Sequence, residues 1–464
     1  MVIATFGAMY FVKKEYDRKK ATENLEIFKS QVKRQYLQEK EFKDKEIPQD
    51  RSTIDKTVPE IIQIYGFKCE IHKVTTNDGY QLELHRIIKN HDEKRRESII
   101  SSPKNLPSNQ KQSYPVILQH GLLADSSNWV INGGDEKSLA FALALRGHDV
   151  WLANSRGNKY SKIHDRYGNE FYMDHNFWNF TWYDMAKNDI PAVINYVCKT
   201  TKLPKTHYIG HSQGTLTMLT ALHENTNDIQ SKIASFHALC PIAFLENSKA
   251  PYRFIANNMP NKLIYSEWKD ELLADNMLGK TFKSRIASLV STSSAYRYAT
   301  GTNGIAAAAS QLSSIPYFVS LFIGFNPHKY CQDKIATIMN HSPSGTSFQN
   351  VLHFAQMMKE GKLQTFKPNL NSQAYEITLE NIKDMDIYLY VGAEDIFSDK
   401  KDVDRLQEIL EKEEKGNKVV RIDLVDYDHA SFLYGKDAYF HVYQHIIERI
   451  ESSLLSRIPE CVQS

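Results

Sequence analysis

Cysteine is scarce in this chain of 464 residues, and the five that occur are widely spaced. They are Cys69, Cys198, Cys240, Cys331 and Cys461, with no Cys-x-x-Cys pair and no spacing typical of a metal site. An odd, sparse set argues against a disulfide framework, although it leaves room for one bridge. His-Glu-x-x-His, EF-hand and P-loop patterns are also missing. We therefore expect neither a bound metal ion nor a cofactor.

An excess of charge of one sign is missing as well. The 57 basic and 55 acidic side chains leave a net charge of +2 at pH 7. Basic clusters such as Arg18-Lys19-Lys20 are interleaved with acids, which is typical of a solvated helix face. Nothing in this balance points to nucleic acid as a partner. Hydrophobic residues make up 42% of the chain, which is enough for a sizeable core.

No hydrophobic run is long enough to cross a bilayer. The apolar run of residues 1–12 would span about 18 Å as a helix, against about 30 Å of hydrocarbon core. It lacks the basic start and the cleavage site of a secretory signal. A short membrane anchor, a truncated gene model, a strip that docks on a partner and a frayed terminus all stay open. The last four residues, Cys461–Ser464, fit a prenylation motif imperfectly, because Gln463 stands where an aliphatic residue is usual.

The pattern of apolar segments divides the chain into four parts. Residues 1–58 form an N-terminal extension whose narrow apolar stripe could meet a protein partner or a patch of the chain's own core. In 59–243 and 371–464, apolar strands alternate with helical patterns, which predicts an α/β fold with a mostly parallel sheet covered on both faces. The interval 244–370 breaks this rhythm, and we interpret it as a helical cap inserted over the strand ends.

One serine stands between two glycines in the segment "HYIGHSQGTL", where a strand pattern turns into a helix pattern. Gly210-x-Ser212-x-Gly214 is the pattern of a nucleophile elbow, in which small flanking residues allow a sharp turn and present the serine at its apex. A serine hydroxyl is a weak nucleophile and needs a neighbouring base. The pattern therefore predicts an acid and a histidine later in the chain.

The last two strand patterns end in candidates for both. Asp395 follows "DIYLYVGAE" and His429 follows "KVVRIDLVDYD", in the order that α/β-hydrolases use. His429 would take the Ser212 proton, and Asp395 would fix the histidine tautomer. Asp399 is the competing acid, but Asp395 is nearer to the strand end.

An oxyanion site needs backbone N–H donors. One is expected from Gln213, the residue after the nucleophile. The other is expected from the loop after an earlier strand, where "VILQ" runs into His120-Gly121 and makes Leu122 the candidate.

From Pro59 to the last helix the sequence resembles the acid lipases, the family of gastric and lysosomal acid lipases. The segments that carry the resemblance include "LQHGLLADSSNWV", "GHDVWLANSRGNKYS", "HYIGHSQGT", "NHSPSGTSFQNVLHFAQMMKEGK" and "GAEDIFSDKKDV". The resemblance implies a capped α/β-hydrolase that acts on triacylglycerols or sterol esters. It also implies the same roles for Ser212, Asp395 and His429, with oxyanion amides at Leu122 and Gln213.

The chain departs from this family in three places. Animal members carry a cap disulfide, whereas this cap interval holds only Cys331, with Cys240 at its edge. The sequence from 245 to 330 matches poorly, and residues 1–58 have no counterpart in the secreted members. Some members are membrane-anchored, which would suit the apolar N-terminus. Of two glycosylation sequons, at Asn179 and Asn340, the first lies among aromatic residues, which favours a buried position.

These patterns predict a serine hydrolase of neutral-lipid esters that works through an acyl-enzyme. Two alternatives remain: acyl transfer to another alcohol by the same residues, and a structural or assembly protein that keeps the hydrolase fold. We expect contact with a membrane or lipid-droplet surface, and a membrane-associated, endolysosomal or secretory location.

Overall fold

The computed structural model describes residues 53–88, 114–169, 174–249, 251–267, 271–272, 329–331 and 334–455. The N-terminal run, the stripe between residues 25 and 36, and Cys461 lie outside these ranges. So does the part of the cap interval between 273 and 328. No helix in the described ranges is both long and apolar enough to span a membrane.

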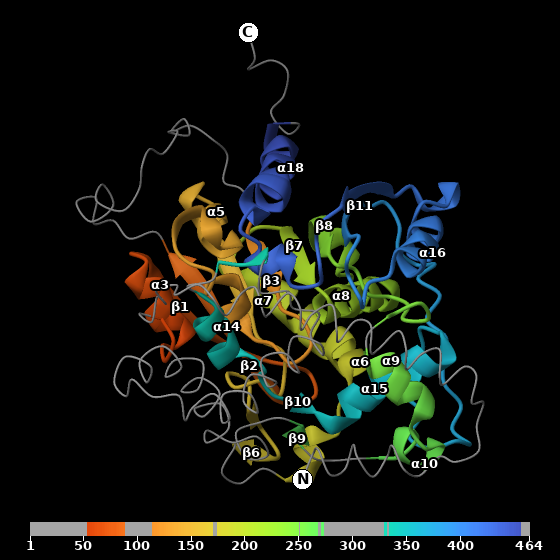
Figure 1. Ribbon diagram of the computed structural model, residues 1–464. Helices are drawn as coiled ribbons and strands as arrows, with labels where there is room; N and C mark the ends of the chain where they lie inside the picture. Colours follow the sequence, from red (N-terminus) through yellow and green to blue (C-terminus); the bar gives the residue numbers. More distant parts are fainter. Residues whose placement is uncertain are drawn as a thin grey trace, which may run out of the picture.

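One large sheet forms the centre of the molecule, with the strand order β12-β11-β8-β7-β3-β4-β2-β5-β6 and with β1 paired to β2 (Figure 1). The strands from β4 to β12 in this order are parallel, and β1, β2, β5 and β6 add an antiparallel edge. The bounds are β1 (Lys68–Thr75), β2 (Tyr80–Ile88), β3 (Val116–Gln119), β4 (Val150–Ala153), β5 (Ile163–His164), β6 (Gly168–Asn169), β7 (Thr206–His211), β8 (Ile233–Leu239), β11 (Asp386–Gly392) and β12 (Lys418–Leu424).

Helices cover both faces of this sheet, because its central strands are apolar on both sides. Along β3, Ile117 packs into one hydrophobic cluster while Val116 and Leu118 pack into the other. The first cluster contains buried residues of α7 (Ile190–Thr201), α8 (Gln213–Glu224) and α16 (Lys400–Leu410). The second contains those of α3 (Val58–Ile64), α5 (Leu139–Leu145) and α18 (Gln444–Leu455). The predicted α/β fold with a mostly parallel sheet is confirmed.

Short elements connect these layers. Before α7 come α6 (Trp182–Asp184) and the π-helical turn η4 (Met185–Asp189), and before α18 come α17 (Ser431–Tyr434) and the π-helical turn η10 (Tyr439–Tyr443). The packed part of the chain begins earlier than the predicted boundary at Pro59. Thr53 and Ile54 are already buried, and Thr57 caps α3 through a reciprocal bond with Glu60.

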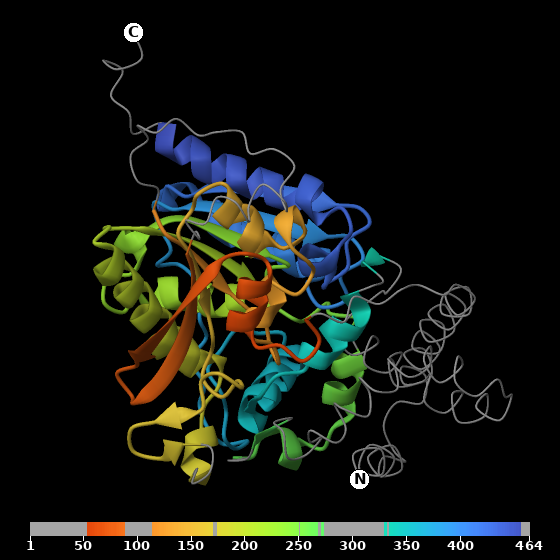
Figure 2. The same cartoon turned by 90° about the vertical axis from the view of Figure 1, so that its left-hand side faces the viewer.

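The described parts of the 244–370 interval are mainly helical. They are α9 (Pro251–Asn258), α10 (Asn261–Ile264), α14 (Ile335–His341) and α15 (Phe348–Glu360), with the short strands β9 (Glu271–Leu272) and β10 (Thr346–Ser347). Figures 1 and 2 both show α9, α10 and α15 grouped at the end of the molecule opposite α18. The division of the chain into a core and a cap stays a prediction.

One of the two sequons differs from expectation. Asn179 is exposed, although its aromatic neighbours Phe177, Trp178 and Phe180 are buried. Asn179 follows a short 3-10 turn, η3 (His175–Trp178), so its side chain points away from the face that its neighbours bury. Asn340 is half-buried, and its amide nitrogen donates to the Ile54 carbonyl at 2.6 Å.

Candidate active site

Ser212 stands in the turn between β7 and α8, with a φ of 54° and a ψ of −117°. Non-glycine residues rarely adopt positive φ, and such strain often marks functional sites. The turn is possible because its flanks carry no side chains. A Cβ on Gly210 would lie 2.7 Å from the Gly214 carbonyl oxygen, and one on Gly214 would lie 2.5 Å from the Gln119 carbonyl oxygen. Both positions therefore require glycine, as an elbow does.

Ser212, His429 and Asp395 are joined by hydrogen bonds across the carboxyl ends of β7, β11 and β12. The His429 Nε2 lies 2.8 Å from the Ser212 Oγ. The His429 Nδ1 lies 2.8 Å from Oδ2 and 3.0 Å from Oδ1 of Asp395. Because a carboxylate only accepts, Nδ1 carries the proton and Nε2 accepts from the serine hydroxyl. The geometry prepares a histidine that can take a proton from the serine.

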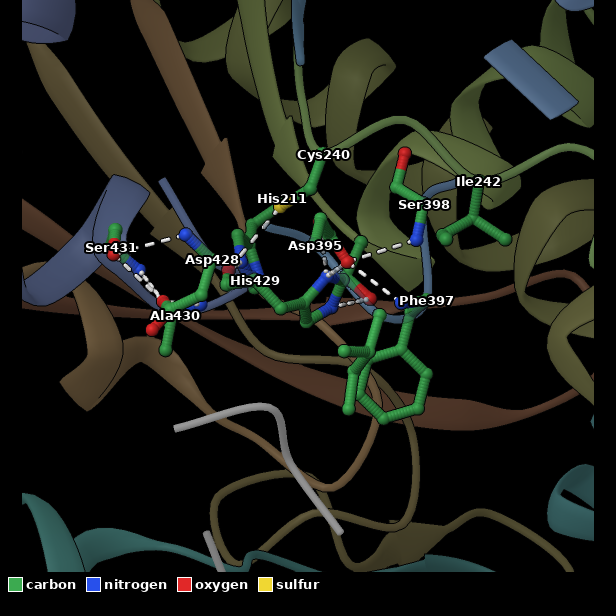
Figure 3. A network of polar contacts seen from close by, with 12 residues as sticks. His211, Cys240, Ile242, Asp395, Phe397, Ser398, Asp428, His429, Ala430 and Ser431 are labelled. Carbon is green, nitrogen blue, oxygen red and sulfur yellow. Dashed lines mark hydrogen bonds and ion pairs between the residues drawn. The ribbon is translucent and has the colours of Figure 1, made fainter. Parts of the chain in front are cut away.

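Asp395 is buried, and its carboxylate faces His429 (Figure 3). Burial opposes its charge, but the His429 charge, the His429 hydrogen bond and the N–H groups of Ser398 and Phe397 outweigh it and hold the pKa of Asp395 below its usual range. The competing acid, Asp399, bonds to other residues. It caps α16 by accepting from the Lys401 N–H at 3.0 Å and pairs with Lys249 at 3.0 Å. Asp395 is the carboxylate that reaches His429.

The two predicted oxyanion amides flank the nucleophile. Gln213 is the first residue of α8, where the backbone N–H has no partner within the helix. Leu122 follows Gly121, and a Cβ on Gly121 would lie only 3.1 Å from the Ser212 Cβ. The loop after β3 thus passes directly beside the serine, with the Leu122 amide next in the chain.

His120 supports this loop in a fixed, neutral form. Its Nδ1 donates to the Gly121 carbonyl at 2.8 Å, and its Nε2 accepts from the Ser155 N–H at 3.0 Å and from the Asn158 amide at 3.1 Å. Because Nε2 faces two donors, it cannot carry a proton, and burial also lowers the pKa of His120. The sequence marked His120 only as part of a strand-ending turn.

The main chain of His429 is held by two side chains that the sequence did not single out. Its carbonyl accepts from the His211 Nε2 at 2.9 Å and from the Cys240 thiol at 3.4 Å. Burial, together with the nearby His429 charge, lowers the pKa of His211 to about 3, and burial raises that of Cys240. Cys240 forms no disulfide.

The same three residues form the one cluster of potential metal ligands found among the described residues. Ligand atoms of His211, Cys240 and His429 lie within 4.8 Å of one another. The His211 Nε2–H and the Cys240 thiol donate to the His429 carbonyl, the His429 Nδ1–H donates to Asp395, and the His429 Nε2 accepts from the Ser212 hydroxyl. A metal ion there would have to displace the bonds that align His429.

Asn350 of α15 is a further residue that sequence reasoning missed. Its amide donates to the Gln213 side-chain oxygen at 2.8 Å, and its own oxygen accepts from the Trp182 N–H at 2.7 Å. Asn350 lay within a stretch that carried the family resemblance, but no local pattern pointed to a partner 137 residues away. It connects the cap interval to the residue after the nucleophile.

Comparison with known proteins places this site in a family. A model described as a partial alpha/beta-hydrolase lipase region matches residues 58–133, and one of the alpha/beta hydrolase fold matches residues 114–277. Lipase lipl-1 of Caenorhabditis elegans is 32% identical over 86% of this chain and 92% of its own. This chain belongs to the α/β-hydrolase lipases. The predicted family and the predicted class of enzyme, an ester hydrolase of the lipase type, are confirmed.

Mammalian members show the same level of similarity to this lipase-family chain. Human lysosomal acid lipase/cholesteryl ester hydrolase is 33% identical over 84% of this chain and 89% of its own. Rat gastric triacylglycerol lipase is 30% identical over 84% of this chain and 90% of its own. Among solved structures, carboxylesterase CesB of Bacillus subtilis covers 86% of this chain and is itself covered to 96%, with 13% identity and a TM-score of 0.43.

Proposed function

We propose that this protein hydrolyses esters of neutral lipids through a Ser212–His429–Asp395 triad and an acyl-enzyme. The observation that carries the proposal is the pair of 2.8 Å contacts that His429 makes, with the Ser212 Oγ on one side and with Asp395 on the other. A strained, outward-turned serine next to an oriented base is an activated nucleophile.

In the first half-reaction the Ser212 Oγ attacks the ester carbonyl carbon while its proton passes to the His429 Nε2. Asp395 stabilises the resulting imidazolium through Nδ1–H and stays ionised. Collapse of the tetrahedral intermediate breaks the bond to the leaving alkoxide, which takes the proton from Nε2 and departs as an alcohol. The acyl group remains as an ester on Ser212.

The negative oxygen of the intermediate is assigned to the N–H groups of Leu122 and Gln213. Fixed donors aimed at a developing charge are worth about 10²–10³ in rate each. The supporting side chains are His120, which fixes the Gly121 carbonyl, and Asn350, which holds the Gln213 side chain. Both keep the loops on either side of the serine from shifting.

In the second half-reaction His429 removes a proton from water, and the hydroxyl attacks the acyl carbon. The Ser212 oxygen leaves and regains its proton from Nε2. The products are a fatty acid and the free enzyme. Another alcohol in place of water would give acyl transfer by the same steps.

For the substrate we propose a triacylglycerol or a steryl ester, because the relatives named above include a triacylglycerol lipase and a cholesteryl ester hydrolase. The same relatives favour an endolysosomal or secretory location. Contact with a membrane or lipid-droplet surface, and a protein partner for residues 1–58, remain part of the proposal.

Labelling with a fluorophosphonate tests the proposal whichever ester the enzyme prefers, because the reagent reacts with the activated serine itself. Mass spectrometry should locate the adduct on Ser212, and Ser212→Ala should abolish it. Product analysis with trioleoylglycerol and cholesteryl oleate then separates the two substrate classes, and added sterol or glycerol reveals any acyl transfer. Failure of folded wild-type protein to form the adduct, together with no hydrolysis of either lipid, would refute the triad assignment.

A further inference from the structure

One short stretch of the cap interval, the return segment (Lys329–Cys331), lies against the loop of His429 and is the first described chain after Leu272. Tyr330 pairs with Gly435 in an antiparallel bridge, and the Lys436 N–H donates to the Lys329 carbonyl at 3.1 Å. The Lys329 ammonium lies 2.6 Å from a carboxylate oxygen of Glu394 and 2.5 Å from the Asp426 carbonyl. The return segment is therefore bonded to both catalytic loops, next to Asp395 and just before His429.

Tyr330 makes the most buried of these contacts. Its side chain is fully buried, and its hydroxyl donates to Oδ1 of Asp428 at 2.5 Å. Asp428 immediately precedes His429 in the chain and is itself only 5% exposed. The tyrosine thus reaches the residue beside the catalytic base from a distant part of the sequence.

Asp428 closes the turn in which His429 stands. Its Oδ1 also accepts from the N–H groups of Ala430 at 3.1 Å and Ser431 at 2.9 Å, and from the Ser431 hydroxyl at 2.7 Å. In Figure 3, Asp428, Ala430 and Ser431 lie on one side of His429, while Asp395, Phe397 and Ser398 lie on the other. His429 is held between this turn and the loop that carries Asp395, Phe397 and Ser398, called here the acid loop.

The donors around Asp428 offset part of the effect of its burial, and the pKa of its carboxyl stays above its usual range. Burial raises the pKa of its carboxyl, whereas the hydrogen bonds from Tyr330 and Ser431 and the charge of Lys329 act against that rise. Loss of the Tyr330 hydroxyl removes a donor that comes from outside the turn, whereas the donors from Ala430 and Ser431 belong to the turn itself.

The acid loop is bonded in the same way to the chain that enters the cap interval. The Ile396 carbonyl accepts from the Lys249 N–H at 2.8 Å and from the Ser248 hydroxyl at 3.0 Å. The Ser398 hydroxyl donates to the Pro241 carbonyl at 2.7 Å. The loop of Asp395 and the loop of His429 therefore both form hydrogen bonds with residues inside the cap interval or just before it.

We propose that Tyr330 is a positioning residue for His429, which anchors the histidine turn through Asp428 and makes the triad geometry depend on the seating of the cap interval. The proposal rests on the catalytic role proposed for His429. It assigns Tyr330 no contact with the substrate, so its effect should fall on kcat rather than on KM.

The test compares Tyr330→Phe with Tyr443→Phe, using p-nitrophenyl butyrate as a small soluble ester. Each substitution removes one hydroxyl from a fully buried ring, and Tyr443 donates to the Leu433 carbonyl at 2.9 Å, away from the Asp428 carboxylate. We expect Tyr330→Phe to lower kcat by about tenfold with KM unchanged, since a misplacement of about 1 Å can cost up to about 10²-fold. Tyr443→Phe should change kcat by less than about twofold, because it removes a bond that does not reach His429.

A double-mutant cycle with Asp428 separates positioning from general loss of stability. Asp428→Asn keeps an acceptor oxygen and should retain most of the activity, whereas Asp428→Ala should be at least as slow as Tyr330→Phe. Adding Tyr330→Phe to Asp428→Ala should cause no further loss, because both changes break one pathway.

Equal kcat values for Tyr330→Phe and Tyr443→Phe, or fully additive losses in the cycle, would overturn the proposal. If the variants give either result while the wild-type protein is labelled on Ser212, the triad assignment stands and only the role of Tyr330 is refuted. Wild-type protein that neither labels nor hydrolyses would overturn both.

Discussion

Gly214→Ala offers the sharpest test of how the elbow is built. A Cβ at this position would lie 2.5 Å from the Gln119 carbonyl oxygen and 2.9 Å from that of His120. Both obstacles are backbone atoms at the end of β3, so no side chain can rotate away. Reaching an ordinary contact of about 3.5 Å requires about 1 Å of movement between α8 and the β3 loop.

That movement separates the two amides assigned to the oxyanion. Gln213 precedes the substituted residue on α8, and Leu122 follows the obstructed end of β3. Loss of one well-placed donor typically costs about 10²–10³ in rate. We therefore expect kcat for p-nitrophenyl butyrate to fall at least about 10²-fold, with a loss of about 1–3 kcal/mol in the free energy of unfolding from overpacking.

Gly147→Ala is the matched control. Gly147 has a φ of +91°, which alanine tolerates poorly, but nothing lies within 4 Å of the added Cβ. It should lose stability by a comparable amount, about 1–2 kcal/mol, and keep its kcat. Urea unfolding measures the first quantity and steady-state kinetics the second. A Gly214→Ala enzyme with wild-type kcat would refute the claim that the glycine clears space for the oxyanion loop.

Three further substitutions probe other parts of the site. Asp395→Asn should lower kcat by about 10⁴, because an amide can turn the His429 ring to the wrong tautomer, and steady-state assays with p-nitrophenyl butyrate will show whether it does. Asn350→Ala should lower kcat and reduce the free energy of unfolding in urea by about 2–4 kcal/mol, since it removes the partners of the Trp182 N–H and of the Gln213 side-chain oxygen. An unchanged kcat would limit Asn350 to a structural role. His353→Phe tests stability in acid. Burial lowers the pKa of His353 to about 3, below the value of about 6.5 in the unfolded chain. The neutral histidine therefore contributes fully to the free energy of unfolding above pH 6.5, and this contribution is lost as the pH falls toward 3. Between pH 8 and pH 5 the free energy of unfolding of the wild type should fall by about 2 kcal/mol more than that of His353→Phe. Phenylalanine keeps a ring stacked on Trp182. Equal losses in the two proteins would contradict the assignment of a neutral buried histidine.

The parts of the site that follow from local pattern could be predicted from the sequence. Gly210 and Gly214 stand two residues either side of Ser212, and that spacing is typical of a tight turn between a strand and a helix. Asp395 and His429 each follow a run of apolar residues, and parallel strands bring such ends to one edge of the sheet. The choice of Asp395 over Asp399 followed from its position nearer to the strand end, and the structure shows Asp399 as the N-cap of α16.

The supports of His429 could not be predicted in this way. Tyr330 meets Asp428 across 98 residues, and His211 meets the His429 carbonyl across 218. His211 ends β7 and His429 follows β12, so the sheet brings that pair together, whereas Tyr330 reaches Asp428 from a segment outside the sheet. Neither contact follows from a periodicity or a spacing in the sequence. Asn179 shows the opposite failure: aromatic neighbours favoured burial, but a 3-10 turn gave adjacent residues different exposures.

Three side chains hold the backbone and the turn of His429. His211 donates through Nε2–H to a carbonyl, and this bond persists whether or not the other nitrogen is protonated. The Cys240 thiol likewise donates without changing charge, since burial raises its pKa. The Asp428 Oδ1 accepts from four donors, and the turn needs this acceptor oxygen rather than the charge. The backbone of His429 is therefore fixed by contacts that acid does not break, while its turn depends on an acceptor oxygen to which Tyr330 donates.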